Sequence, residues 1–185
     1  TVESISKLFG GLKIDGYYAI PMDEIPKLNH SVGGVTVTLL EDFQDIDRQM
    51  KKGETLALSD EQAYHYIHDR YGVGDEKNTS RMKRQQQYME AFFTKAKEKA
   101  KSDKAYVSQL FRKFEQTATT NLTAKKISGL TNRLIKVTQK GFFEIQGTSK
   151  IGKALGDGID HAEFYPDKKS IIDVMTKIYG LKKRE

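Results

Sequence analysis

A pair of glycines at residues 33–34 separates two segments whose apolar residues recur with different periods. Residues 23–32, before the pair, predict a short helix in which Pro26 is tolerated because it lies in the first turn. In residues 35–39 apolar side chains alternate with threonines, and this period of two predicts a half-buried strand. Residues 14–20 predict an earlier strand. The order strand, helix, strand favours an α/β domain.

The composition of the chain limits what it can be. Its 185 residues, 37% of them hydrophobic, are enough to bury a core in one domain or in one large piece of a domain. Because the chain has no cysteine, disulfides, thiolate zinc sites and a cysteine nucleophile are excluded. No run approaches the roughly 18 apolar residues that span a bilayer. The net charge of +6 favours an anionic partner. Charge alone does not decide whether that partner is nucleic acid, a phosphate-rich polymer or an acidic membrane.

A capping box marks the start of one helix with particular clarity. Ser59 and Gln62 have the required spacing and predict a helix over residues 59–70. A loop with two glycines follows, and Asn78 or Thr79 is then expected to cap a long, lysine-rich helix. The remaining expectations are helices at 2–9, 102–116, 123–138 and 171–179, strands at 141–145 and 164–165, a surface excursion at 41–58, and a flexible hairpin or connection at 147–158.

Arginines surround the loop between these two helices. Arg81, Arg84 and Gln85 lie three and four residues apart, so they share one side of the second helix, and Arg70 ends the first. Two arginines near a helix start oppose the helix dipole at a cost of up to about 1 kcal/mol, unless an anion is bound. The pattern therefore predicts a phosphate or diphosphate site. The alternative that spacing leaves open is a set of surface ion pairs with Asp69, Asp75 and Glu76.

Several segments together resemble the signature of the LytR-CpsA-Psr family of cell-envelope glycopolymer transferases. They are SDEQA at 59–63, YIHDR at 66–70 and NTSRMKRQ at 78–85, preceded by DGYY at 15–18 and VGGVTV at 32–37. Several elements thus recur in order and at sensible distances. The likeness is clearest over the first half of the chain and weaker toward its end.

This resemblance implies a fold and a function. The family's fold is an α/β domain with a central mixed β-sheet covered by helices, and residues 1–185 would form the carboxy-terminal portion of one such domain. Its members transfer polyprenyl-pyrophosphate-linked anionic glycopolymers, of teichoic acid or capsule type, to peptidoglycan in the Gram-positive cell envelope. The alternative to such a phosphotransferase is a non-catalytic binding module for anionic wall polymer or lipid diphosphate.

The resemblance also implies where the parent protein works and what it needs. The family is extracellular and membrane-anchored, which places the expected amino-terminal anchor outside this chain. Magnesium is expected to assist at the diphosphate through ligands that also lie outside this chain, so no metal site is expected within it.

Individual residues carry over from the family's signature. Arg70, Arg81 and Gln85 match its diphosphate-contacting positions, Arg70 and Arg81 with a catalytic role, and Arg84 matches its second arginine. Their implied role is to neutralise charge on the leaving diphosphate. The chain departs from the pattern at His68, where arginine is usual, and at Asn78, where aspartate is usual. Both remain candidate diphosphate contacts.

Other groupings admit a functional and a structural interpretation. Met89, Phe92 and Phe93 predict a groove for a polyprenyl tail if exposed, or core packing if buried. His65 and His68, with Asp69, suggest a metal site that lacks a third convergent ligand.

Nucleic-acid binding is a further alternative because the chain is basic. The lysines at 95, 97, 99 and 101 spread around their helix instead of forming one stripe, and neither a helix-turn-helix nor an aromatic sheet platform is evident. A regulatory domain of this kind would bind DNA with a steep dependence on salt. We therefore expect no nucleic-acid partner.

Overall fold

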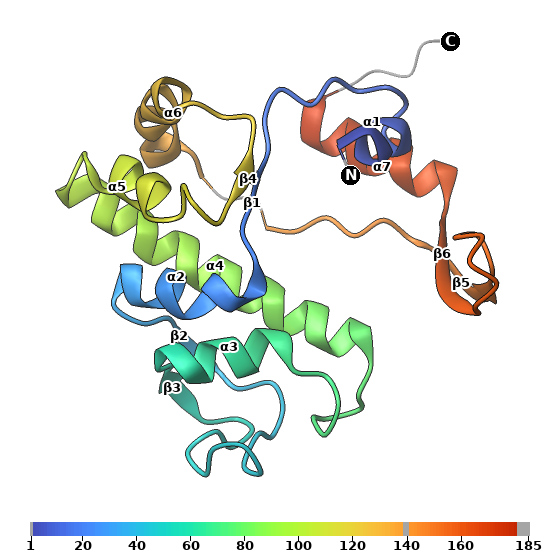
Figure 1. Ribbon diagram of the computed structural model, residues 1–185, viewed down its shortest axis with the longest axis horizontal. Helices are drawn as coiled ribbons and strands as arrows, with labels where there is room; N and C mark the ends of the chain where they lie inside the picture. The colour runs from blue at the N-terminus through green and yellow to red at the C-terminus, as the bar shows by residue number, and fades with distance from the viewer. Residues whose placement is uncertain (1, 139–140, 181–185) are drawn as a thin grey trace. The chain divides into compact units, whose positions relative to one another are not determined.

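The computed structural model describes residues 2–138 and 141–180, which divide between two compact units (Figure 1). The larger unit comprises Gly16–Lys140, and the smaller comprises Thr1–Asp15 with Gly141–Glu185. Every site residue predicted from the sequence lies in the larger unit. No helix among the described residues is both long and apolar enough to cross a bilayer.

The larger unit is mainly helical. Figure 1 shows α2 and α3 lying along the long helix α4. Its elements in chain order are β1 (Tyr18–Ala19), the 3-10 helix η1 (Met22–Glu24), α2 (Ile25–Val32), β2 (Thr36–Thr38), β3 (Thr55–Ala57), α3 (Asp60–His68), α4 (Asn78–Ser102), α5 (Tyr106–Lys113), β4 (Thr119–Thr120) and α6 (Ala124–Lys136).

The glycine pair ends α2 as the sequence predicts. Gly33 adopts a left-handed φ of 76°, and its N–H bonds back to the carbonyls of Asn29 and His30. Gly34 has a φ of 81°, and an added Cβ would lie 3.1 Å from the carbonyl oxygen of Leu58. The chain can therefore turn directly into β2, which pairs antiparallel with β3.

A buried asparagine joins α2 to the elements around it. The Asn29 side chain accepts from the Val35 amide at 2.9 Å and donates to the Leu58 carbonyl at 3.0 Å and to Asp60 Oδ1 at 2.9 Å. Tyr88 of α4 donates to the same Asn29 oxygen at 3.3 Å. These bonds compensate the burial of the amide and fix α2 against β2, α3 and α4.

Residues 41–58 are mostly exposed, as expected of a surface excursion, but a few of their side chains are buried. Phe43 and Met50 in this segment are fully buried, the Phe43 amide donates to the Met50 carbonyl at 2.9 Å, and β3 completes the segment. The sequence did not predict these buried positions or β3, because isolated apolar side chains in an irregular segment leave no periodic signal.

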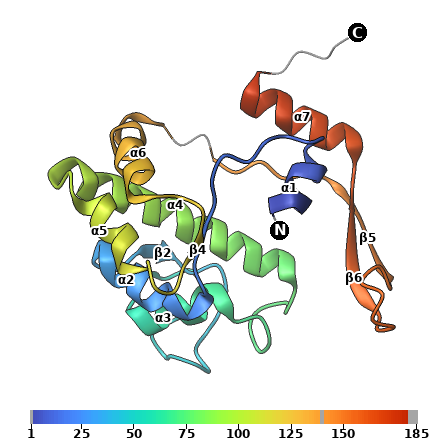
Figure 2. The ribbon, with the colours of Figure 1, turned by 45° about the horizontal axis from the view of Figure 1, so that its top comes forward.

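The smaller unit contains two helices and a hairpin (Figure 2). It is built from α1 (Val2–Leu8), β5 (Gly147–Gly152), β6 (His161–Pro166) and α7 (Lys168–Tyr179). The hairpin interpretation of the glycine-rich segment is confirmed, since Gly147 to Gly152 pair with β6. The strand expected at 141–145 is not formed. Several apolar side chains are exposed on this unit, namely Ile151, Leu155, Ile159, Phe164, Tyr165, Ile178 and Tyr179.

Helices and strands combine as the α/β class requires. The strands of the described residues form three two-stranded antiparallel sheets, in which β1 pairs with β4, β2 with β3 and β5 with β6. None of these described strands has a second neighbour, so they do not by themselves build the expected central mixed sheet. The prediction of a single domain stays a prediction.

Candidate functional site

The predicted site lies where α3 leads into α4. The capping box at the start of α3 is confirmed, because the Gln62 amide donates to Ser59 Oγ at 3.1 Å and the Ser59 amide to Gln62 Oε1 at 2.9 Å. The loop after α3 turns through Gly72 and Gly74, both with positive φ. Glu76 also has a positive φ, 56°, and accepts from the Gly72 amide, which holds the loop closed.

Two side chains of α4 cap the last turn of α3. Arg84 donates through Nη1 to the Tyr66 carbonyl and through Nη2 to the Asp69 carbonyl at 2.6 Å, and Gln85 donates to the Ile67 carbonyl at 2.9 Å. These carbonyls have no partner within α3, and a cation is favourable at the end of a helix where they gather. Arg84, only 1% exposed, thus fixes α3 against α4 from inside.

Glu41 completes the surroundings of Arg84. Arg84 Nε lies 2.8 Å from Glu41 Oε2, and both atoms are buried. The two groups form an ion pair, but the Nε–H bond is not aligned with the carboxylate oxygen for a hydrogen bond. Burial lowers the pKa of Arg84, while the charges of Glu41 and Asp69 oppose that shift. A Cβ on Gly74 would lie 2.1 Å from Glu41 Oε1, so only glycine leaves room for this carboxylate. Sequence spacing gives no signal that Glu41 belongs to this site.

Arg70 and Arg81 differ from Arg84 because their guanidinium groups are only partly used. Arg70 donates to the Tyr71 hydroxyl, with its guanidinium carbon 4.3 Å from the centre of the Tyr71 ring. Arg81 donates through Nη2 to Asn78 Oδ1 at 2.7 Å. The Nε atoms of Arg70 and Arg81 are both buried and have no hydrogen-bond partner in the described part of the chain. Such unsatisfied donors are costly unless an acceptor reaches them.

The acidic neighbours do not neutralise Arg70 or Arg81. Within the described ranges neither arginine forms an ion pair, whereas Asp75 lies 3.7 Å from Lys77 and Asp69 is held by two histidines. The surface-pair interpretation therefore fails for these two arginines in the part of the chain that the structure describes.

The start of α4 has no side-chain cap. Its N-cap is Lys77, whose side chain makes no capping bond among the described residues, and the first turn has no acidic residue, although Asp75 just before the helix accepts from the Lys77 amide at 3.0 Å. The expectation that Asn78 or Thr79 caps the helix is wrong, because α4 already begins at Asn78, whose oxygen accepts from Arg81 instead. Exposed amides at a helix start attract an anion.

His65, Asp69 and His68 form a hydrogen-bonded group beside Arg84. The Nδ1 atoms of His65 and His68 lie 2.7 Å and 2.9 Å from the two oxygens of Asp69. Burial raises the pKa of Asp69, but the hydrogen bonds from His68 and His65 outweigh it and leave that pKa below its ordinary value. His68 also stacks on Tyr64, with ring centres 4.7 Å apart.

These residues do not fit a magnesium or zinc ion. Among residues 2–138 and 141–180 no group of three or more histidine, aspartate or glutamate side chains is arranged to hold a metal. The two histidines share Asp69 instead, and the Glu41 carboxylate is engaged by Arg84. The expectation that magnesium ligands lie outside this chain stays a prediction.

The three candidate lipid-groove residues have different surroundings. Phe92 belongs to the core and stacks on Tyr88 with ring centres 6.5 Å apart, Met89 is partly buried against that core, and Phe93 is 48% exposed. Core packing thus accounts for Phe92. The groove stays a prediction.

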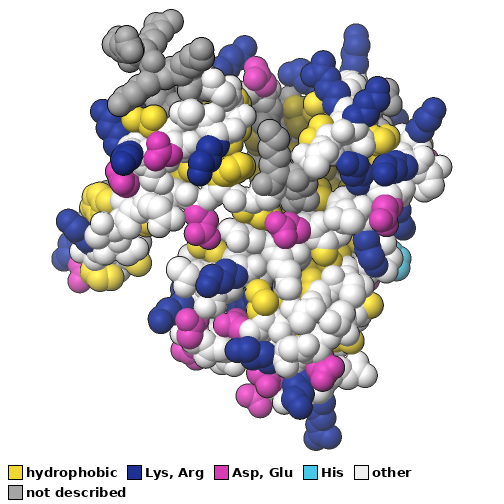
Figure 3. All heavy atoms as spheres, turned by 180° about the vertical axis from the view of Figure 1, so that it is seen from behind, with side chains coloured by type: hydrophobic (Ala, Val, Ile, Leu, Met, Phe, Trp, Pro, Cys, Tyr) yellow, Lys and Arg dark blue, Asp and Glu magenta, His cyan; other side chains and the backbone are white. Residues whose placement is uncertain are grey.

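The charged surface does not single out a partner. On the face shown in Figure 3, lysine and arginine side chains are interspersed with aspartate and glutamate. Charged side chains of both signs, interspersed in this way, are typical of an ordinary solvated protein surface.

Comparison with known proteins places the chain in a family. The profile described as the LytR_cpsA_psr family matches residues 1–178. Among solved structures, TagV of B. subtilis is similar with a TM-score of 0.72 at 21% identity, over 97% of this chain and 68% of TagV. Lin1025 of Listeria innocua is similar with a TM-score of 0.68 at 21% identity, over 97% of this chain and 71% of Lin1025.

A further structure extends the likeness along the whole chain. TagU of B. subtilis is similar with a TM-score of 0.64 at 18% identity, over 100% of this chain and 72% of TagU. Identities at this level show a shared fold. No curated protein sequence matches the chain.

Proposed function

Because the chain belongs to the LytR-CpsA-Psr family of cell-wall glycopolymer transferases, we propose that it transfers a polyprenyl-pyrophosphate-linked anionic glycopolymer to peptidoglycan. The polymer would be of the teichoic acid or capsule type. The reaction would take place outside the cytoplasmic membrane of a Gram-positive cell, with the parent protein anchored to that membrane.

The observation that carries this proposal is the pair of unsatisfied buried Nε atoms on Arg70 and Arg81, beside the uncapped start of α4. A diphosphate supplies acceptor oxygens for both guanidinium groups and for the free helix amides. In transfer of the phosphoryl-linked polymer, the bond between the two phosphates breaks and negative charge grows on the leaving polyprenyl phosphate. Cations fixed in place before the reaction stabilise that charge without reorganising.

We assign different roles to the arginines around the loop. Arg70 and Arg81 contact the diphosphate, since their donors are not all committed within the chain. Arg84 and Gln85 are positioning residues, since their donors bond to the carbonyls at the end of α3. This differs from the expectation that all four bind the diphosphate.

His68 and Asn78 adjust the charge of the site. Asn78 accepts a hydrogen bond from Arg81 without neutralising it, whereas an aspartate at this position would add a negative charge that competes with the diphosphate. His68 is held by Asp69 through Nδ1, which leaves Nε2 as the nitrogen able to meet a phosphate oxygen. Magnesium would be bound by ligands that lie outside these residues, and it would partly neutralise the negative charge of the diphosphate.

A non-catalytic module that binds lipid diphosphate is the second candidate. It requires only the buried Nε donors of Arg70 and Arg81, which have no hydrogen-bond partner among the described residues. The two candidates share the arginines and differ in whether a bound donor is consumed. Turnover of a lipid-linked glycopolymer, in which the phosphoryl-linked polymer moves to a peptidoglycan hydroxyl and polyprenyl monophosphate is released, decides between them.

The test is a titration of the full-length protein with a short polyprenyl diphosphate, with and without magnesium. Arg81→Ala is expected to weaken binding by about tenfold to a hundredfold, the value of charge-assisted hydrogen bonds. Arg48→Ala is the matched control, because Arg48 is an exposed arginine on the connection between β2 and β3. Equal losses for the two variants, or no saturable binding by the unchanged protein, would overturn the proposal.

A further inference from the structure

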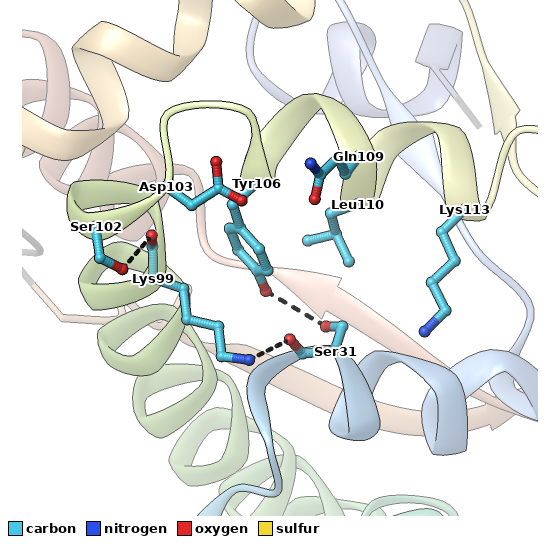
Figure 4. Close-up of a pocket in the computed structure, with 8 residues that line it drawn as sticks. All are labelled: Ser31, Lys99, Ser102, Asp103, Tyr106, Gln109, Leu110 and Lys113. Atoms are coloured by element: carbon cyan, nitrogen blue, oxygen red, sulfur yellow. Dashed lines mark hydrogen bonds between the residues drawn. The ribbon is translucent and has the colours of Figure 1, made fainter.

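A pocket lined by polar and apolar side chains lies at the opposite end of α4 from Arg81. It has a volume of about 470 Å³ and is bounded by the end of α2, the last turn of α4 and α5 (Figure 4). Lys99 on its wall is 18 residues beyond Arg81, which corresponds to about 27 Å along the helix axis. The pocket is therefore separate from the proposed diphosphate site.

Two lysines give this pocket a positive wall. Lys99 of α4 donates to the Ser31 carbonyl at 3.1 Å, with its Nζ 6.0 Å from the centre of the Tyr106 ring. Lys113 of α5 approaches from the other side (Figure 4) and forms no ion pair or hydrogen bond with the described residues. Asp103 is the only carboxylate among the lining residues, so the lining carries a net positive charge.

An aromatic side chain and an aliphatic one lie between the lysines. Tyr106 is 8% exposed and Leu110 is partly buried, so each presents a limited apolar surface to the pocket. The Tyr106 hydroxyl lies 3.4 Å from Ser31 Oγ, and burial raises the pKa of Tyr106, which keeps this hydroxyl neutral. The pocket thus has an apolar wall with a fixed polar edge.

Hydrogen-bonding groups surround this apolar wall. Asp103 accepts from the Ala105 amide through Oδ1 at 2.8 Å, which holds the carboxylate at the start of α5 and leaves Oδ2 for another donor. Gln109 adds an exposed amide. Hydroxyl groups of a ligand could therefore meet both an acceptor and a donor here.

We propose that this pocket binds one anionic sugar unit of a glycan chain, a sugar phosphate in its simplest form. Lys113 meets the phosphate, the exposed parts of Tyr106 and Leu110 contact the C–H face of the ring, and Asp103 and Gln109 bond to its hydroxyls, while Lys99 adds positive charge from the opposite wall. The assignment of this unit to the transferred polymer rests on the proposed function. The binding of a sugar phosphate does not.

The combination of groups favours this ligand over simpler ones. Inorganic phosphate uses the lysines alone, and two mobile ammonium groups at a solvent-exposed site bind it weakly. A neutral sugar leaves Lys113 without a partner. A sugar phosphate contacts the charged wall through its phosphate and the apolar wall through its ring. Its affinity therefore exceeds that of phosphate alone or of a neutral sugar alone.

The experiment titrates the protein with glucose 1-phosphate, glucose and inorganic phosphate, observed through the backbone amide resonances of α5 and the end of α4. Glucose 1-phosphate is expected to shift the signals around Tyr106 and to bind roughly tenfold more tightly than either part. Lys113→Gln is expected to remove this advantage, whereas Lys51→Gln, at an exposed lysine between β2 and β3, leaves it unchanged. Both substitutions are at exposed positions and do not threaten folding.

The outcomes separate this pocket from the diphosphate site. Unchanged binding in Lys113→Gln, or phosphate binding as tightly as glucose 1-phosphate, would overturn the sugar site. Arg81→Ala should weaken polyprenyl diphosphate binding and leave glucose 1-phosphate binding as it was. If the diphosphate titration fails while the sugar phosphate still binds, the proposed function falls and the sugar site stands.

Discussion

The two ends of α4 both carry cations, but they use them differently. At the amino-terminal end the arginine cluster, defined as Arg70, Arg81 and Arg84, lies in a network in which Arg84 is buried and bonded to α3 carbonyls and Glu41. At the carboxyl-terminal end Lys99 and Lys113 border an open pocket. One end joins secondary structure elements together, and the other leaves its charges to solvent.

This difference follows from the chemistry of the two cations. A guanidinium group is planar and offers five donors, so Arg84 bonds to two carbonyls while its Nε faces a carboxylate. A lysine ammonium is a point charge on a flexible chain, which suits an exposed rim. We conclude that binding at the arginine end depends on the integrity of the fold, whereas binding at the lysine end can be changed without affecting stability.

The largest expected effect comes from removing the buried arginine. Arg84→Met leaves Glu41 charged and buried without its partner and uncaps the last turn of α3. The free energy of unfolding should fall by about 3–5 kcal/mol, the cost of breaking a buried ion pair. Urea denaturation followed by circular dichroism measures this change.

The matched substitution at the other end sharpens the contrast. Lys99→Met changes an exposed lysine with one backbone hydrogen bond and should alter the free energy of unfolding by less than about 1 kcal/mol. Adding Glu41→Leu to Arg84→Met should restore part of the loss, since no buried charge then lacks a partner. A loss of similar size in Arg84→Met and Lys99→Met would contradict the proposed division between the two ends.

A smaller effect is expected from a glycine in the loop of the arginine cluster. Gly74→Ala places a Cβ 2.1 Å from Glu41 Oε1 at a φ of 57° and displaces the carboxylate that faces Arg84. Gly72→Ala has a φ of 74° but meets nothing within 4 Å. We expect losses of about 2 kcal/mol and about 1 kcal/mol in stability, respectively. Equal losses would show that Glu41 moves aside freely.

Local signals in the sequence were sufficient for most helices of the larger unit. The Ser59 capping box and the glycines after α2 act within a few residues, and the structure confirms both. The spacing of Arg70, Arg81 and Gln85 predicted a site between α3 and α4, and that site stays a prediction. The sequence did not predict the uncapped start of α4, because the Asn78 oxygen accepts from the Arg81 side chain and not from a backbone amide.

The contacts that the sequence did not predict join distant segments. Glu41 and Arg84 are 43 residues apart, and Lys113 reaches the pocket beside Ser31 across a longer separation still. One sequence contains no record of which distant residues meet. The burial of Phe43 and Met50 was missed for the same reason, since both lie in an irregular segment and pack into a core built from distant residues, such as Tyr66 against Phe43.

The smallest expected effect is a pH dependence at the arginine end. The pKa of Asp69 is lowered in the folded chain by His68 and His65 against the opposing effect of burial, so the ionised carboxylate stabilises the fold. This contribution is complete above the ordinary aspartate pKa of about 3.9 and is lost as the pH falls through the lower folded value. Denaturation between pH 5 and pH 3 should therefore show a decline in stability that is shallower in Asp69→Asn. The double variant His65→Gln with His68→Gln should flatten it likewise, because the hydrogen bonds that lower the pKa come from those rings. A decline as steep in both variants as in the unchanged protein would assign the acid sensitivity to other carboxylates.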